Sequence, residues 1–98
     1  MIETDVAYRG NDINNGLHDP KQPDAVSCQS YCRSNYPTAK FFDWVGTSNH
    51  WSDGHNTCWC KTSDAGRSTG PDAMGEVSGE VFCGGRLYVT SFKTKYVL

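Results

Sequence analysis

The segments CQSYC, residues 28–32, and CWC, residues 58–60, hold four of the five cysteines in two close pairs. Helical spacing would put the first pair on one side of a helix, about 6 Å apart along its axis. Extended spacing would put the second pair on one side of a strand, about 7 Å apart. Because the two spacings match, we expect a helix to lie over a strand and to be joined to it by two neighbouring disulfides.

Spacing alone leaves the connectivity of these disulfides open. The bridges are either Cys28–Cys58 with Cys32–Cys60 or the crossed pairing, depending on whether the helix and the strand run in the same direction. The first closed loop holds about 30 residues, and closing it stabilises the fold by about 3–4 kcal/mol in the chain-entropy model. The alternative is a four-cysteine zinc site. It fits less well, because zinc ribbons hold their cysteines in tight knuckles on turns, whereas here one pair is expected on a helix and the other on a strand.

The fifth cysteine, Cys83, has no partner in this scheme. Three states stay open for it: a free buried thiol, a bridge between the two chains of a dimer, or a bond to a cysteine of an upstream segment. A nucleophilic thiol would need an adjacent base, and nothing in the sequence marks a histidine as that base. We therefore expect no catalytic residue, no cofactor and no metal site.

The composition is that of one small domain with a thin supply of core residues. The chain has 98 residues, of which 37% are hydrophobic and 10 are glycine. Such domains often need covalent staples, which the cysteines can supply. The net charge of −2 and the lack of a basic run argue against nucleic-acid binding. No apolar stretch approaches the roughly 20 residues that insert across a membrane, and residues 1–5 do not resemble a signal peptide, so we expect a secreted chain to be a mature form.

One helix is expected, starting near Pro23 and ending before Asn35. Proline favours the first helical position, and Asp24 suits the first turn because the helix dipole favours negative charge there. The expected apolar stripe consists of Ala25, Val26, Cys28 and Cys32. The residues expected to face water are Gln29, Ser30, Arg33 and Ser34.

Short segments rich in β-branched and aromatic residues, bounded by turn residues, are typical of strands. We expect strands at 6–8, 12–13, 39–45, 57–61, 76–82 and 86–92, a turn at 14–16, and loops at 46–56 and 63–72. At least one of Trp44 and Trp59 should lie in the core, because each is on a strand with one buried face. The fold class is therefore α+β, with one central helix packed on a small, mostly antiparallel sheet.

The order of several short motifs resembles the PAN/Apple domain family. The segments that carry the likeness are YRGNDI at 8–13, PDAVSCQSYC at 23–32, KFFDW at 40–44, CWCK at 58–61 and VSGE at 77–80 with Cys83. The match runs from about Asp5 to Cys83 in the single domain of residues 1–98, and residues 84–98 form an extension that we expect to add a strand. The resemblance implies a curved antiparallel sheet cradling one helix, stapled by disulfides, in a non-catalytic domain that binds proteins or carbohydrates outside the cell.

Two departures from the family pattern concern cysteines. Many family members carry a cysteine just before the aromatic strand, bonded to the second helix cysteine, and this chain has none there, so Cys60 can take over as the partner of Cys32. The family pattern then implies that Cys28 bonds Cys58. The family's N-terminal cysteine, which often bonds the closing one, is also missing, which leaves the state of Cys83 open.

The loop at 46–56, GTSNHWSDGHN, is the candidate ligand-binding segment. Aromatic faces stack on the C–H surfaces of sugars while polar neighbours bond their hydroxyls, and the same set suits a protein hot spot. The alternatives are that Trp51 folds back on its own hairpin, that the polar residues cap turns, and that Lys61, on the strand after the loop, is solvated. The candidate binding residues are Trp51, His50, Asp53, His55 and, on the following strand, Lys61.

The sequence thus predicts a secreted, extracellular binding or adhesion module that recognises a glycan or an extracellular protein. The main alternative is a protein-interaction module that belongs to a larger multidomain secreted protein. A zinc or redox protein built on the four paired cysteines is the weakest hypothesis.

Overall fold

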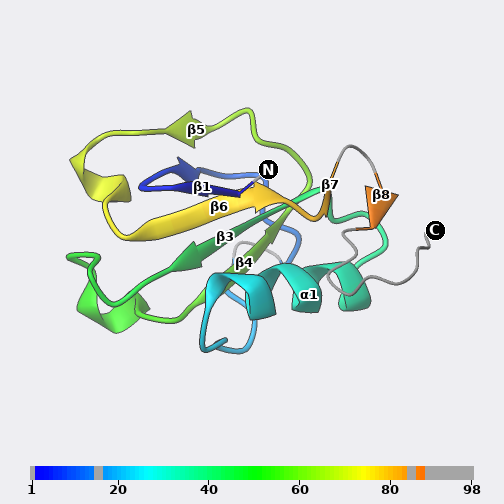
Figure 1. The fold of residues 1–98 in the computed structure, drawn as a ribbon, viewed down its shortest axis with the longest axis horizontal. Helices are drawn as coiled ribbons and strands as arrows, with labels where there is room; N and C mark the ends of the chain where they lie inside the picture. The colour runs from blue at the N-terminus through cyan, green and yellow to red at the C-terminus, as the bar shows by residue number, and fades with distance from the viewer. Residues whose placement is uncertain (1, 15–16, 84–85, 88–98) are drawn as a thin grey trace.

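A four-stranded antiparallel sheet lies at the centre of the computed structural model, which describes residues 2–14, 17–83 and 86–87. Its strands, in spatial order, are β1 (Ile2–Thr4), β6 (Glu76–Glu80), β3 (Phe41–Val45) and β4 (Cys58–Lys61). The helix α1 (Ala25–Asn35) packs along the sheet, against β3 and β4 (Figure 1). For the described part of the chain, the predicted α+β arrangement of one α-helix on an antiparallel sheet is confirmed.

Several shorter elements surround the sheet. β2 (Ala7–Tyr8) pairs antiparallel with β5 (Arg67–Ser68). β7 (Phe82–Cys83) pairs antiparallel with β8 (Arg86–Leu87). Two single-turn 3₁₀ helices lie in the long loops, η1 (Ser52–Gly54) and η2 (Pro71–Ala73).

The two faces of the sheet carry different side chains, because successive strand residues point to opposite sides. Phe42 lies opposite Cys60 and Trp44 lies opposite Cys58, so these residues share the face that α1 covers. The backbone N–H of Tyr8 donates to a carboxylate oxygen on the second face, at 3.3 Å, so β2 lies across that face. The residues of the second face that concern the site are Asp43, Val45, Trp59, Lys61, Glu76 and Ser78.

Two disulfides join α1 to β4. Cys28 bonds Cys58 and Cys32 bonds Cys60, each with its Cα atoms 5.4 Å apart. This uncrossed pairing, which requires α1 and β4 to run in the same direction, is the one that the resemblance implies. Three of the sulfurs lie within 4.8 Å of one another, but a disulfide sulfur is not the thiolate that zinc binds, so the arrangement favours bridges over a zinc site. Two such bridges indicate an oxidising environment.

The hydrophobic core lies between α1 and the sheet, around the two disulfides. Phe42, Val81 and Ala39 are buried there with the four sulfurs. Trp44 is partly buried against this cluster, and its Nε1–H donates to the carbonyl oxygen of Gln22 at 2.9 Å. The prediction that at least one of the two strand tryptophans packs in the core is therefore confirmed by Trp44.

The helix differs from its prediction at its start and in its orientation. It begins at Ala25, and Asp24 is its N-cap, accepting the N–H of Ser27 at 2.8 Å rather than lying inside the first turn. Val26, expected in the apolar stripe, is 54% exposed. Gln29, expected to face water, is only 6% exposed, because its amide reaches across to donate to a backbone carbonyl of β6 at 2.7 Å. The buried face of the helix is thus narrower and more polar than its spacing suggests.

The strand predictions hold best at the centre of the sheet. Segment 12–13 forms only an isolated bridge, between Asp12 and Lys61, instead of a strand. Segment 39–45 begins its strand at Phe41, and segment 76–82 divides into β6 and β7. β1 and β5 were not predicted, because strands of two or three residues depend on their partners rather than on their own sequence.

Some predictions concern residues that the structure does not describe. Residues 15–16 of the predicted turn, the strand beyond Leu87 and nearly all of the extension 84–98 lie outside the described residues. The thiol of Cys83 lies outside them as well, so its state stays a prediction.

Candidate functional site

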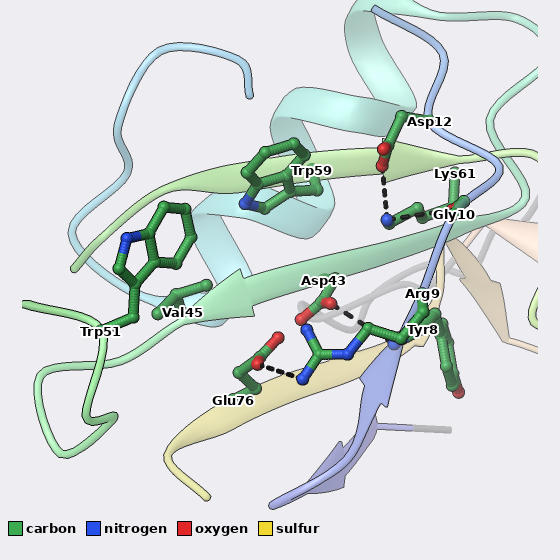
Figure 2. Close-up of a pocket in the computed structure, with 10 residues that line it drawn as sticks. All are labelled: Tyr8, Arg9, Gly10, Asp12, Asp43, Val45, Trp51, Trp59, Lys61 and Glu76. Atoms are coloured by element: carbon green, nitrogen blue, oxygen red, sulfur yellow. Dashed lines mark hydrogen bonds and ion pairs between the residues drawn. The ribbon is translucent and has the colours of Figure 1, made fainter. Parts of the chain in front are cut away.

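A pocket of about 220 Å³, which we call the Trp51 pocket, opens on the sheet face opposite α1 (Figure 2). Its floor is formed by residues of the sheet: Asp43, Val45, Trp59, Lys61 and Glu76. Its sides come from the segment that begins in β2 and from the 46–56 loop: Tyr8, Arg9, Gly10, Asp12 and Trp51. Its volume is below the roughly 300–1,000 Å³ of drug-sized sites, so the pocket fits one small group such as a sugar ring or a single side chain.

Two tryptophans form the aromatic wall of the pocket. The ring centroids of Trp51 and Trp59 are 6.3 Å apart, with the ring planes tilted by 39°. Trp59 is held in place because its Nε1–H donates to Thr57 Oγ1 at 3.0 Å and because His18 packs edge-on against its ring. Trp51 lies against its own loop at Gly54, as one alternative expected, yet it stays 45% exposed. Nearly half of the surface of Trp51 is therefore open to a ligand at the mouth of the pocket.

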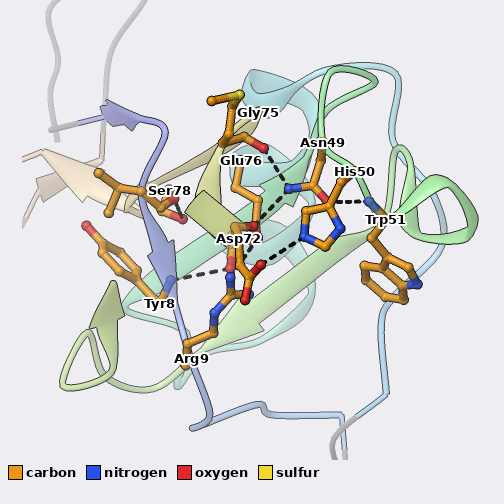
Figure 3. A network of polar contacts seen from close by, with 12 residues as sticks. Tyr8, Arg9, Asn49, His50, Trp51, Asp72, Gly75, Glu76 and Ser78 are labelled. Carbon is orange, nitrogen blue, oxygen red and sulfur yellow. Dashed lines mark hydrogen bonds and ion pairs between the residues drawn. The ribbon is translucent and has the colours of Figure 1, made fainter. Parts of the chain in front are cut away.

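A buried asparagine positions the loop that carries Trp51 (Figure 3). Asn49 Nδ2 donates to the carbonyl oxygens of Asp72 at 3.0 Å and of Met74 at 2.6 Å. Asn49 Oδ1 accepts the backbone N–H of Trp51 at 2.9 Å. Because the side-chain amide uses both of its ends, it ties the loop to the η2 segment and fixes the backbone that presents the tryptophan.

Three of the five predicted binding residues do not line the pocket. His50 Nε2 lies 3.1 Å from Asp72 Oδ1, with both side chains largely exposed. His55 Nε2 lies 2.7 Å from the carbonyl oxygen of Asn49. Asp53 is an exposed residue of η1. The two histidines thus brace the loop in this arrangement.

Trp51 and Lys61 are the two predicted binding residues that the structure brings to the pocket. Lys61 is only 4% exposed, so the interpretation of it as a solvated lysine is wrong. Its Nζ donates to the carbonyl oxygen of Gly10 at 3.0 Å and to the carboxylate of Asp12. The same Nζ lies 5.6 Å from the centroid of Trp59. The floor therefore holds a positive charge between an aromatic ring and an acid.

Four charged residues of the pocket were missed by the sequence analysis: Arg9, Asp12, Asp43 and Glu76. Arg9 Nη2 lies 3.1 Å from Glu76 Oε2, with the arginine half exposed and the glutamate buried. Asp43 and Glu76 are each only 3% exposed. One signal for them was available, since a carboxylate in the middle of an aromatic strand is unusual and alternation sets it on one face of the sheet.

The carboxyl group of Asp43 has an unusual proton affinity. Burial raises its pKa well above its usual range, and the neighbouring Glu76 carboxylate raises that pKa further. Lys61 and the Ser78 hydroxyl lower the pKa of Asp43, but by less. Asp43 therefore holds a proton to a higher pH than an ordinary aspartate does.

Comparison of the chain with protein-family models finds no match, and comparison with curated proteins finds no relative. The resemblance to PAN/Apple domains therefore rests on the motifs of the sequence. No helix among the described residues is both long and apolar enough to cross a membrane.

Proposed function

We propose that the chain is a secreted, non-catalytic binding module of the PAN/Apple type that recognises a carbohydrate through the Trp51 pocket. One observation carries the proposal: a tryptophan with nearly half of its surface exposed stands at the mouth of a small pocket with a charged floor. A sugar ring offers an apolar C–H face to such a ring and hydroxyls to the polar groups around it.

The polar groups of the pocket suit hydroxyl recognition. Arg9 is half exposed and has N–H groups beyond the one that faces Glu76, so it can donate to a ligand. Asp12 keeps a carboxylate that can accept from a ligand while it pairs with Lys61. Since Arg9 is held by Glu76 and Asp12 is held by Lys61, both side chains lose little freedom when a ligand binds.

The membership of the PAN/Apple family and the extracellular setting are supported by two further features. The motifs occur in the order of the family from about Asp5 to Cys83. The two cysteines of α1 form bridges with the two cysteines of β4. Disulfides persist in oxidising compartments such as the extracellular space.

A protein ligand is the alternative, because an exposed tryptophan also anchors protein interfaces. The size of the pocket favours the sugar: a protein partner would insert one side chain into it and would need a much larger surrounding contact, of about 800 Å² on each partner.

A glycan array tests the proposal with three proteins: the wild-type chain, Trp51→Ala and Val26→Ala. Val26 is an exposed apolar residue of α1, on the side of the sheet away from the pocket, so its variant is a matched control for the loss of a surface hydrophobic group. We expect the wild type and the control to bind the same glycans, and Trp51→Ala to bind them about tenfold more weakly or worse, as is typical of a central aromatic contact. Equal glycan binding by Trp51→Ala, or no binding by the folded wild type, would contradict the proposal.

A further inference from the structure

A pair of buried carboxyl groups lies beneath the Trp51 pocket. Asp43 on β3 is opposite Ser78 on β6, and Val45 is opposite Glu76, so Asp43 and Glu76 are diagonal neighbours on the same face of the sheet. Diagonal neighbours on adjacent strands lie about 7–8 Å apart at Cα, which a long side chain can span. Both side chains line the Trp51 pocket, and the Glu76 carboxylate is near enough to raise the pKa of Asp43.

Each carboxyl group uses one oxygen and leaves the other without a partner. Asp43 Oδ2 accepts the N–H of Tyr8 at 3.3 Å, and Glu76 Oε2 faces the guanidinium of Arg9 at 3.1 Å (Figure 2). Asp43 Oδ1 and Glu76 Oε1 are buried and have no hydrogen-bond donor within the described part of the chain. Two buried acceptors without a donor would lower the stability of the fold. A single proton on one carboxyl group makes that oxygen a hydrogen-bond donor to the other.

The charges around the pair balance when the pair holds one proton. Arg9 and Lys61 bring two positive charges to the pocket, and Asp12 and Glu76 bring two negative charges. Asp43 would add a third negative charge with no cation of its own. From β6, the hydroxyl of Ser78 also faces Asp43; it is uncharged, and it donates to the carbonyl oxygen of Val6 at 2.8 Å.

We infer that Asp43 and Glu76 share one proton beneath the Trp51 pocket, that this proton makes the pocket electrically neutral, and that the pocket therefore selects an uncharged sugar. The ligand part of this inference rests on the proposed function. An acidic sugar would add a charge beside a glutamate that is already buried, and an amino sugar would add one beside Arg9 and Lys61.

The shared proton also links binding to pH. A ligand that fills the pocket removes water from above the pair, which costs more when both carboxyls are ionised than when one proton is held. Binding of a neutral sugar therefore favours the protonated pair. Its affinity should fall as pH rises through the titration of the pair, by about threefold if the ligand deepens the burial of the pair modestly.

Two readouts on the full chain test the inference. Carbon NMR follows the carboxyl carbons of Asp43 and Glu76 in the ligand-free protein from about pH 3 to about pH 9. Indole N–H shifts of Trp51 then measure the binding of methyl glycosides at both ends of this range, using the neutral, uronic acid and amino forms of glucose, galactose and mannose. Glu76→Gln, which leaves a single ionisable carboxyl, checks that any linked titration belongs to the pair.

We expect the carboxyl carbon of Asp43 to titrate above the usual range of an aspartate, with a linked change at the carboxyl carbon of Glu76, and a neutral glycoside to bind more tightly at low pH. Independent titrations in the ordinary range would overturn the shared proton. A linked titration with no binding of any sugar would overturn the ligand part and count against the proposed function, while leaving the proton in place. Preferred binding of a charged sugar would support the proposed function and overturn the neutral pocket.

Discussion

The substitution Asp43→Asn keeps the shape of the side chain beneath the pocket and removes its ionisable group. The new amide oxygen can accept the N–H of Tyr8, as Asp43 Oδ2 does. The new amide nitrogen can donate to the Glu76 oxygen that has no partner. The variant therefore provides hydrogen bonds for the side chains at positions 43 and 76 at every pH. The wild type does so only while the acid pair holds its proton.

The sign and size of the effect on stability follow from the raised pKa of Asp43. Unfolded aspartate titrates at about 3.9, so above that pH the folded protein holds a proton that the unfolded chain has released. The stability contributed by the held proton is complete below about pH 4 and is lost as pH rises through the folded-state pKa of the pair. The loss amounts to about 1.4 kcal/mol per pH unit, the value for one proton, until that pKa is reached.

Other carboxyl groups act in the opposite direction, so the total stability curve mixes both effects. A hydrogen bond from Arg67 lowers the pKa of Glu3, and the backbone N–H of Ser27 lowers the pKa of Asp24. Both contributions are the same in the wild type and in Asp43→Asn. The difference between the two unfolding free energies therefore isolates the acid pair.

Urea unfolding followed by tryptophan fluorescence, at a series of pH values from about 4 to about 8, measures this difference. We expect the stability of Asp43→Asn relative to the wild type to increase with pH and then to level off. Asp53→Asn, the same change at an exposed carboxyl outside the pocket, is the control and should show no such increase. A difference for Asp43→Asn that does not change with pH would refute the shared proton.

Three further substitutions test the parts that hold the site in place. Asp24→Ala should lower the unfolding free energy by about 1 kcal/mol in urea unfolding because it removes the helix cap, whereas Asp24→Asn should be close to neutral; equal effects of the two would contradict a capping role. Lys61→Met should cost about 2–3 kcal/mol because it leaves Asp12 without its partner, and the double variant with Asp12→Asn should recover part of this loss in the same assay; no recovery would argue against the ion pair. Gly54→Ala should weaken glycan binding, because the added Cβ would lie 2.0 Å from a ring carbon of Trp51 and must displace that ring; unchanged binding on the glycan array would show that the ring position is not needed.

The sequence was most informative where spacing and covalent geometry act together. The four paired cysteines predicted a helix over a strand, because a four-residue spacing on a helix matches a two-residue spacing on a strand. Even there, the predicted buried face of the helix was wrong at two residues, since Val26 is exposed and Gln29 is buried. A helix held by two bridges takes its orientation from the bridges, and a polar side chain such as Gln29 is tolerated beneath it because it finds a backbone acceptor.

The candidate site was predictable in part. Trp51 and Lys61 could be named because an exposed aromatic residue and a strand-end lysine are recognisable types. Asp43 and Glu76 could not be paired from the sequence, because their proximity depends on β6 lying beside β3, which places β6 between β3 and the N-terminal strand. Strand order of this kind is set by the packing of the whole sheet and not by any local pattern.

The pocket as a sugar site is tested most directly by an amide and indole NMR titration of the wild-type chain with the neutral methyl glycosides, at a pH where the acid pair is protonated. We expect the shifts of Trp51, Trp59 and Lys61 to change with ligand concentration, while residues of α1 on the far side of the sheet stay unchanged. Saturable changes confined to α1, or no change at Trp51 with any of the sugars, would contradict the account.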